Sequence, residues 1–378
     1  MAPRSPSMTR KAGRCDMSIL APPVAPGLLR DPADVIPFDQ SALTTFLSKR
    51  GQRLSDGPIL QFAGGYGNLN YLIHVDDGWA VLRRPPLGEI PKGANDMARE
   101  HRSLSVLSPV WSLAPRPLAF CDDTSVLGAP FLISEFRAGL PLHGAEPLGR
   151  PLSPSQARCL SLLQIQILTQ LHGFSIAAIG AQGLGRAEGF AARTLKGWGA
   201  RLEGSTATPP AEALTLFKRL NAAPPADQRV SVIHNDFKLD NVVVDPETLA
   251  PNAVLDWDMS TLGAPLFDLS TLLTYWCEAS DPAGLRATNL THSEAAGALT
   301  RRELTQAYIR ASGFDSAQDE ADLRHFLALA FAKLGVVYLQ LYDRYLSDPE
   351  GYARNQKFGA AAPGAFALGN DVLDGNVI

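Results

Sequence analysis

The spacing of hydrophobic residues changes along the chain from a pattern typical of strands to one typical of helices. A helical pattern at residues 42–49 is followed, from about residue 59 to residue 136, by short apolar runs between turn residues, which predict strands. From Ser153 onward the apolar residues recur at helical spacing. This order predicts an α+β protein with two lobes, a small antiparallel-sheet lobe at residues 31–137 and a larger, mainly helical lobe at residues 138–378.

Composition narrows the classes of function that the chain can have. The 378 residues are 46% hydrophobic and 19% charged, with a formal net charge of −4, as in an ordinary soluble globular protein. The sequence contains no basic stripe of the kind that would indicate a nucleic-acid partner. No apolar run approaches the length of a membrane span. Residues 1–30 are basic but lack the apolar stretch of a secretory signal, so we expect a disordered tail there. Four cysteines without metal-ligand spacing predict free thiols in a reducing, cytoplasmic compartment: Cys15, Cys121, Cys159 and Cys277.

The candidate chemistry is concentrated in two short segments of the helical half. Residues 234–241 read HNDFKLDN, and residues 256–258 read DWD. Apolar runs flank both segments, and the loop at residues 245–252 between two of these runs is rich in turn residues. If those two runs pair as an antiparallel hairpin, Asn241 and Asp256 lie at the same open end. Amide and carboxylate oxygens suit Mg²⁺, so we predict a magnesium site at these two residues.

The spacing of the first segment, H-x-D-x-x-x-x-N, is that of a kinase catalytic loop, and Asp256 stands where the D-F-G aspartate of kinases stands. In this interpretation Asp236 is the base that orients the acceptor hydroxyl and accepts its proton. Lys238 neutralises charge on the transferring phosphoryl group. His234 is expected to brace the loop backbone, and Asp258 is a weaker candidate for metal or substrate binding.

The strand-rich half offers candidates for nucleotide binding. Gly64, Gly65, Gly67 and Asn68 link two predicted strands, and glycines there would let backbone N–H groups approach a triphosphate. The third strand ends in two arginines, where kinases place a lysine, and strand alternation allows one of them to face the cleft. The spacing favours Arg83 over Arg84; the alternative is a solvated surface arginine.

A carboxylate supports the choice of Arg83. Glu100 lies on the apolar stripe of a predicted helix that begins at Asn95 or Asp96, where an unpaired charge would be costly. We expect Glu100 to pair with Arg83, as glutamate pairs with lysine in kinases; the alternative is an exposed Glu100 on a broader polar face. The last predicted strand, residues 130–137, should contact the adenine edge through its backbone, and Glu135 is our candidate there.

At this point the chain resembles a known family. Residues 81–86 (VLRRPP), 97–100 (MARE) and 256–265 (DWDMSTLGAP) are similar to the aminoglycoside phosphotransferase branch of the protein-kinase-like fold. Within that branch they resemble most the kinase domain found free in bacteria and fused to some acyl-CoA dehydrogenases. The resemblance implies ATP- and Mg²⁺-dependent phosphorylation of a small-molecule hydroxyl, that of 4-hydroxyacyl-CoA compounds. The chain departs from this family at two positions. Asn235 stands where glycine is commoner, and Lys238 stands where arginine or histidine is commoner.

Three alternatives differ in acceptor or in activity. A protein kinase is disfavoured, because Asp268 follows Asp256 by only twelve residues, which leaves little room for an activation segment. Asp268 is expected to brace the catalytic loop. An aminoglycoside or choline kinase would favour an acidic pocket, whereas residues 137–229 hold ten Lys or Arg and five Asp or Glu. The only support for a regulatory pseudokinase is the arginine that stands in place of the kinase lysine. The sequence leaves the acceptor and the oligomeric state open.

Overall fold

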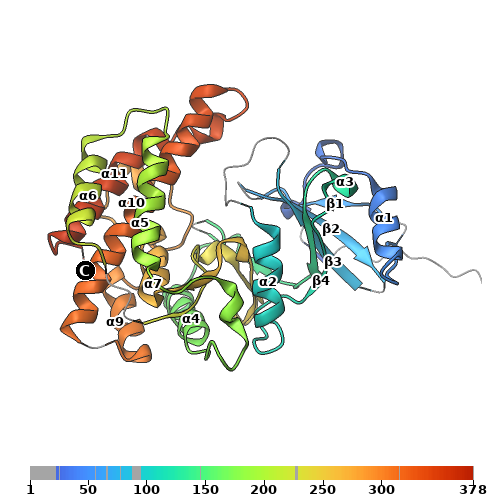
Figure 1. Cartoon of the computed structure of the whole chain (residues 1–378), viewed down its shortest axis with the longest axis horizontal. Helices are drawn as coiled ribbons and strands as arrows, with labels where there is room; N and C mark the ends of the chain where they lie inside the picture. Colours follow the sequence, from blue (N-terminus) through green and yellow to red (C-terminus); the bar gives the residue numbers. More distant parts are fainter. Residues whose placement is uncertain are drawn as a thin grey trace, which may run out of the picture.

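The computed structural model describes residues 23–24, 26–55, 57–64, 67–76, 78–86, 95–144, 146–225, 229–314 and 316–377. The chain forms a small lobe built on a sheet and a larger helical lobe beside it, with α2 (Met97–Leu107) where they meet (Figure 1). The predicted two-lobe α+β fold is thereby confirmed. Most of the predicted tail lies outside the described residues, but Pro26–Leu28 forms a short 3-10 helix and Leu29 bridges to Phe62. Regular structure is thus already present before residue 31, the expected start of the small lobe.

The small lobe is an antiparallel sheet of five strands in the order β1-β2-β3-β5-β4. Its strands are β1 (Leu60–Gln61), β2 (Leu69–Val75), β3 (Gly78–Arg84), β4 (Pro117–Cys121) and β5 (Phe131–Glu135), and its helices are α1 (Gln40–Ser48), α2 and α3 (Thr124–Leu127), with a 3-10 turn at Pro32–Asp34. The side chain of Asp39 caps α1, and that of Asp96 caps α2, so α2 begins after Asp96 rather than after Asn95. A separate core under the sheet includes Leu43, Tyr71 and Phe131.

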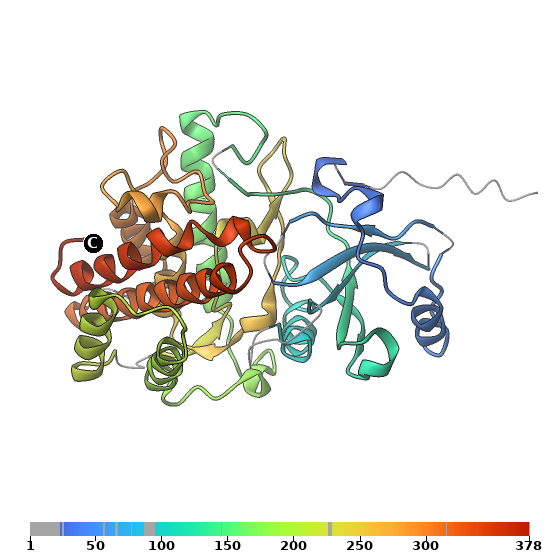
Figure 2. The same ribbon diagram turned by 90° about the horizontal axis from the view of Figure 1, so that it is seen from above.

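The large lobe is mainly helical, and its longest helix, α10, packs against α11 (Figure 2). Ser153 is the N-cap of α4 and forms a capping box with Gln156. The helices are α4 (Pro154–His172), α5 (Phe190–Glu203), α6 (Ala211–Ala222), α7 (Pro265–Tyr275), α8 (Ala283–Arg286), α9 (Arg301–Ser312), α10 (Ala317–Ser347) and α11 (Phe358–Leu373), with 3-10 turns η3 (Ala181–Leu184), η4 (Leu239–Asn241), η5 (Trp257–Met259) and η6 (Ala353–Asn355).

Among the described residues, α10 is long and apolar enough to cross a membrane by length and composition, contrary to the sequence-based expectation. The most apolar window of this helix is 72% buried within the protein. This burial is what a core helix of a large helical lobe requires.

The strands of the large lobe form two small sheets, so the predicted hairpin is present but does not stand alone. The expected hairpin is present as β8 (Val242–Val244) and β9 (Pro251–Val254), with Val242 opposite Val254. β6 (Leu140–Pro141) adds a third strand to it. β7 (Ser231–Ile233), which leads into residue 234, pairs instead with β10 (Thr261–Gly263). These partner strands are short and come from distant parts of the sequence.

Gly139 connects the lobes where the chain leaves β5 for β6. Its φ of +136° is a conformation that side chains rarely adopt, and a Cβ there would lie 2.5 Å from the carbonyl oxygen of Val244. Gly144, a few residues later, also has a positive φ of +84°, but a Cβ there would meet no atom within 4 Å. Both positions carry the conformational constraint, and Gly139 adds a steric one.

We therefore expect Gly139→Ala to lower the free energy of unfolding by about 2–4 kcal/mol, through strain and a backbone clash. Gly144→Ala, the matched control, should cost about 1–2 kcal/mol through strain alone. Urea denaturation of both variants measures the difference. Equal losses would show that the contact with Val244 does not constrain the connection between the lobes.

Candidate active site

A buried carboxylate fixes the backbone that follows β7. Asp268, in the first turn of α7, is fully buried and accepts hydrogen bonds from the backbone N–H groups of His234 and Asn235, each at 2.7 Å. Asn235 has a left-handed φ of +65°, the conformation in which the glycine common at this position would be unstrained. His172 Nε2 lies 3.2 Å from the same carboxylate. The structure thus gives Asp268 the bracing contacts that the sequence predicted.

His234 joins the catalytic loop to the strand that ends before Asp256. Its Nε2 lies 2.9 Å from the carbonyl oxygen of Leu255, and its Nδ1 lies 3.3 Å from the backbone nitrogen of Asp236. A carbonyl accepts and a backbone N–H donates, so these partners fit a neutral imidazole with the proton on Nε2. The imidazole is fully buried and braces the backbone, as expected.

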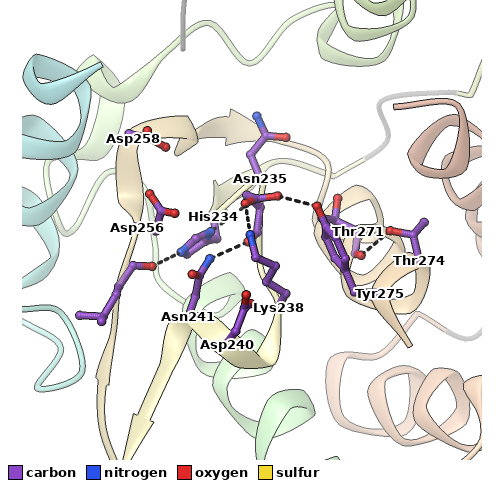
Figure 3. A network of polar contacts seen from close by, with 12 residues as sticks. His234, Asn235, Lys238, Asp240, Asn241, Asp256, Asp258, Thr271, Thr274 and Tyr275 are labelled. Carbon is purple, nitrogen blue, oxygen red and sulfur yellow. Dashed lines mark hydrogen bonds and ion pairs between the residues drawn. The ribbon is translucent and has the colours of Figure 1, made fainter. Parts of the chain in front are cut away.

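The Asp236 carboxylate lies within a network of donors, two of which, Lys238 and Tyr275, are labelled in Figure 3. Lys238 Nζ lies 2.6 Å from Asp236 Oδ2, and the Tyr275 hydroxyl lies 3.3 Å from Oδ1. Lys333 Nζ is 3.8 Å from Oδ1. Burial alone would raise the pKa of Asp236, but the two ammonium groups outweigh burial and lower it. Asp236 is therefore an anion with two cationic neighbours, one from the motif and one from α10.

Asn241 and Asp256 lie at the same end of the β8–β9 hairpin, as predicted (Figure 3). The backbone N–H of Leu255 donates to the carbonyl of Asn241 at 2.8 Å, which sets Asn241 across from the residue before Asp256. The Asn241 Nδ2 donates to the carbonyl of Asp236 at 3.0 Å, and this contact fixes the amide. Asp256 has a φ of +71°, and its side chain is 30% exposed. The pair thus offers an oriented amide and an accessible carboxylate.

Arg83 connects the two lobes. Its Nε lies 2.9 Å from Glu100 Oε2 in α2, and its Nη2 contacts Asp256 Oδ1. Asp258 Oδ2 is 3.9 Å from the same Nη2. The expected pairing of Arg83 with Glu100 is present in the structure, and the buried Glu100 is not on an exposed polar face.

The neighbouring Arg84 faces the other way, as strand alternation predicts, but it is not at the surface. It is 2% exposed, and its Nη1 donates to the carbonyl of Leu127 in α3. The alternative of a solvated surface arginine therefore fits neither residue. Arg84 serves the packing of the small lobe.

The cluster around Arg83 carries excess negative charge when its carboxylates are all ionised. One guanidinium faces Glu100, Asp256 and Asp258. Burial raises the pKa of Glu100 to about 7, although Arg83 opposes the shift. Burial, together with the charge of Asp256, raises the pKa of Asp258 to about 8. With all three carboxylates ionised, the cluster would carry two negative charges in excess, which one divalent cation would balance.

The oxygens of Asn241 and Asp256 suit Mg²⁺ better than they suit a metal ion that is coordinated by protein ligands alone. Among the described residues, no group of three or more His, Cys, Asp or Glu could enclose an ion. Instead, Asp256 supplies a carboxylate from the negative cluster itself, and Asn241 supplies an amide oxygen from the same end of the hairpin. Mg²⁺ commonly takes one or two protein ligands and completes its shell with water and phosphate oxygens.

The glycine-rich loop approaches this cluster through Asn68. Gly64, Gly67 and Asn68 lie between β1 and β2 as predicted, whereas Gly65 lies outside the described residues. The Asn68 Nδ2 lies 3.4 Å from Asp258 Oδ2; with the amide turned over, its Oδ1 lies 2.6 Å from Arg83 Nη2. The loop is therefore tied to the cluster through one side-chain amide.

Glu135 lies at the end of β5, apart from these contacts. Its backbone N–H donates to the carbonyl of Arg116 at 2.9 Å, and its carboxylate accepts from the backbone N–H of Arg116 at 2.8 Å and meets Arg137 at 2.6 Å. Its amide and carboxylate are thus already engaged. The assignment of Glu135 to the nucleotide rests on its position between the lobes.

Sequence reasoning missed Tyr275 and Lys333. Tyr275 ends α7, seven residues and two helical turns after Asp268, so it lies on the same face as the bracing carboxylate. Lys333 is the only charged residue between His325 and Asp343 in the sequence. A lone lysine in an apolar helix implies a buried partner, and this signal was available.

The two lobes, the braced loop and the charged cluster between them define a kinase-like phosphotransferase. The sequence pattern of the phosphotransferase enzyme family matches residues 58–330, and the chain belongs to this family.

The chain is 29% identical over 329 residues to human acyl-CoA dehydrogenase family member 11, with 84% of this chain and 41% of that protein aligned. It is 28% identical over 327 residues to mouse acyl-CoA dehydrogenase family member 10, with 85% and 30% aligned. The chain therefore spans less than half the length of these relatives.

Solved structures share the fold. A Ralstonia eutropha protein assigned to the aminoglycoside phosphotransferases superposes with a TM-score of 0.71 at 23% identity, covering 90% of this chain and 99% of that one. A type I macrolide 2′-phosphotransferase superposes with a TM-score of 0.55 at 19% identity, covering 85% and 97%.

The arginine cluster predicts how nucleotide affinity responds to mutation. Arg83→Ala and Glu100→Ala should each weaken the apparent affinity for ATP, and the double variant should be little worse than either, with a coupling of about 0.5–3 kcal/mol. Arg84→Ala should leave ATP affinity nearly unchanged but lower the melting temperature, because it removes a buried contact. Nucleotide titration and thermal melting of the four variants measure both effects. Additive losses at Arg83 and Glu100, or a greater loss of affinity at Arg84, would contradict this arrangement.

Proposed function

We propose that the protein transfers the γ-phosphate of ATP to a hydroxyl group of a small molecule, with Mg²⁺ as cofactor. The observation that carries this proposal is the convergence of Asp236, Asn241 and Asp256 beside an arginine–glutamate pair from the other lobe. In the same proposal, residues 31–137 form the nucleotide-binding lobe and residues 138–378 the catalytic and substrate lobe. Cytoplasmic localisation is also proposed and fits the free, buried thiols of Cys121 and Cys277.

In the transfer step, the acceptor oxygen attacks the γ-phosphorus while the bond from that phosphorus to the β,γ-bridging oxygen breaks. ADP leaves with the electron pair of that bond, and the hydroxyl proton passes to Asp236. Because its pKa is lowered, Asp236 is a weak base, and its main contribution is to orient the hydroxyl. The transition state of phosphoryl transfer is loose, so the proton need not move early.

Other residues of the chain handle the phosphates. Lys238 and Arg83 offset negative charge, and Gly64, Gly65, Gly67 and Asn68 let the backbone approach the triphosphate. Glu100 holds Arg83 in place, and Glu135 lies at the adenine end. Asn241 and Asp256 would hold Mg²⁺, which neutralises phosphate charge when bound.

For the acceptor we propose a hydroxyacyl-CoA, such as a 4-hydroxyacyl-CoA. Asp236 is flanked by two ammonium groups, and the stretch after β5 is rich in Lys and Arg, so the acceptor side suits an anion. The names of the relatives contain acyl-CoA dehydrogenase, which adds weight to an acyl-CoA. The second candidate is an aminoglycoside- or choline-type acceptor, and one fold neighbour is assigned to the aminoglycoside phosphotransferases. A regulatory pseudokinase is opposed by the presence of Asp236, Asn241 and Asp256.

The assignment of Asn241 and Asp256 to Mg²⁺ predicts that variants of the two residues lose activity and metal binding to different degrees. Asp256→Ala should abolish transfer and raise the Mg²⁺ concentration needed for nucleotide binding, because it removes a charged ligand, and Asn241→Ala should be milder. Glu247→Ala, which removes an exposed carboxylate from the turn of the same hairpin, is the control. Titration of Mg²⁺ at fixed nucleotide measures the dependence. If both site variants kept the metal dependence of the unmodified protein, Mg²⁺ would bind elsewhere.

A screen of acceptors tests the reaction itself. ADP release is measured with a 4-hydroxyacyl-CoA, its free hydroxy acid, an aminoglycoside and choline. We expect acceptor-dependent turnover with the CoA ester, and Asp236→Asn, which retains the shape of the side chain, should lose about 10²- to 10⁴-fold of it. Nucleotide binding without turnover by any acceptor would favour the pseudokinase, and turnover with the cationic acceptors alone would replace the proposed substrate.

A further inference from the structure

A buried lysine reaches the catalytic loop from a helix near the C-terminus. Lys333 lies in the middle of α10, is 4% exposed and has the fully buried Ala332 and the buried Leu334 as neighbours. Burying an ammonium group costs free energy unless strong partners compensate. The surrounding helix is apolar, so the compensation comes from other elements: the loop that Lys333 touches and the Phe267 ring of α7, whose centroid lies 5.7 Å from Nζ.

The first partner of Lys333 is the strained peptide of the loop. Its Nζ donates to the carbonyl oxygen of Asn235, the residue with a φ of +65°. The backbone N–H of Asn235 is held by Asp268, and its Nδ2 donates to the carbonyl of Met259 at 3.1 Å. Lys333 therefore restrains the carbonyl of a residue that is otherwise held through its backbone N–H and its side chain.

The second partner is the carboxylate of Asp236. Lys238 approaches Oδ2 closely, at 2.6 Å, whereas Oδ1 has the longer contacts with Tyr275 at 3.3 Å and Lys333 at 3.8 Å. The two lysines thus approach the two oxygens separately. Because Oδ1 is held more loosely, it is the oxygen better able to accept a further hydrogen bond from a hydroxyl.

We infer that Lys333 is a positioning residue for phosphoryl transfer, which fixes the plane of the Asp236 carboxylate so that Oδ1 faces the acceptor hydroxyl. No bond to Lys333 forms or breaks, and its ammonium keeps its protons throughout. This inference rests on the proposed function, in which Asp236 orients the acceptor. It goes beyond that function by assigning a role to a residue 97 positions away from Asp236 in the sequence.

The test compares Lys333→Met with Lys218→Met, which removes an exposed lysine from α6 of the same lobe. Methionine is close to lysine in length and suits the apolar helix, so the fold should be retained. A displaced catalytic group costs roughly 10- to 100-fold in rate, and we expect a loss of this size in kcat for Lys333→Met with the KM for ATP unchanged. Lys218→Met should match the unmodified protein in both constants.

A second substitution separates the carboxylate from the turn. Asn235→Gly relieves the left-handed strain, so in the Lys333→Met background it should restore kcat if Lys333 merely stabilises the turn. We expect it to raise the melting temperature without restoring kcat. Recovered kcat in the double variant, or an unchanged kcat in Lys333→Met, would overturn the inference.

The comparison is repeated on the slow hydrolysis of ATP, in which water replaces the alcohol. This reaction does not depend on the identity of the acceptor, so failure of the acceptor screen and failure of the Lys333 inference give different results. If Lys333→Met does not fold, Lys333→Gln and Lys333→Arg replace it. Retained hydrolysis in Lys333→Arg with loss in Lys333→Gln supports the role of the charge, and equal rates contradict it.

Discussion

The arrangement of the active site depends on the contact between the Asp268 carboxylate and two successive backbone N–H groups. After β7 the chain turns through the left-handed conformation of Asn235, so the N–H groups of His234 and Asn235 point to one side and need a shared acceptor. A carboxylate near the N-terminus of α7 supplies it, and the helix dipole favours negative charge there. With the turn fixed, the direction of the Asp236 side chain follows.

Arg83 performs the corresponding task between the lobes. Its strand belongs to the small lobe, while Asp256 follows the hairpin of the large lobe, so the parts of the site that come from the two lobes are held together through one guanidinium. Arginine suits this position because its planar group can meet two carboxylates at once. In the proposed reaction, Asp256 would exchange a contact with Arg83 for the metal, and Arg83 would turn to the phosphates. The substitution of arginine for lysine is thus compatible with activity.

Prediction from the sequence succeeded where residues that act together are close in the chain or follow one period. The loop from His234 to Asn241, the β8–β9 hairpin and the choice of Arg83 all came from local spacing, and the structure brings these groups together. Strand alternation gave the direction of Arg84 but not its burial, because α3, which covers it, is distant in the sequence. The pairing of β7 with β10 was missed for a similar reason, since three-residue strands carry almost no periodic signal.

The missed residues also explain why the acceptor is harder to infer than the reaction. Phosphoryl transfer needs a few groups at short spacing, which one segment supplies, whereas the charge around the acceptor is set by side chains from separate helices, such as Lys333. The result is a segregation of charge: carboxylates in excess around Arg83 and ammonium groups in excess around Asp236. A divalent cation would balance the first region. In the proposed reaction the second region would face the transferring phosphate, and it would disfavour an acceptor whose own positive charge lies beside the reacting hydroxyl.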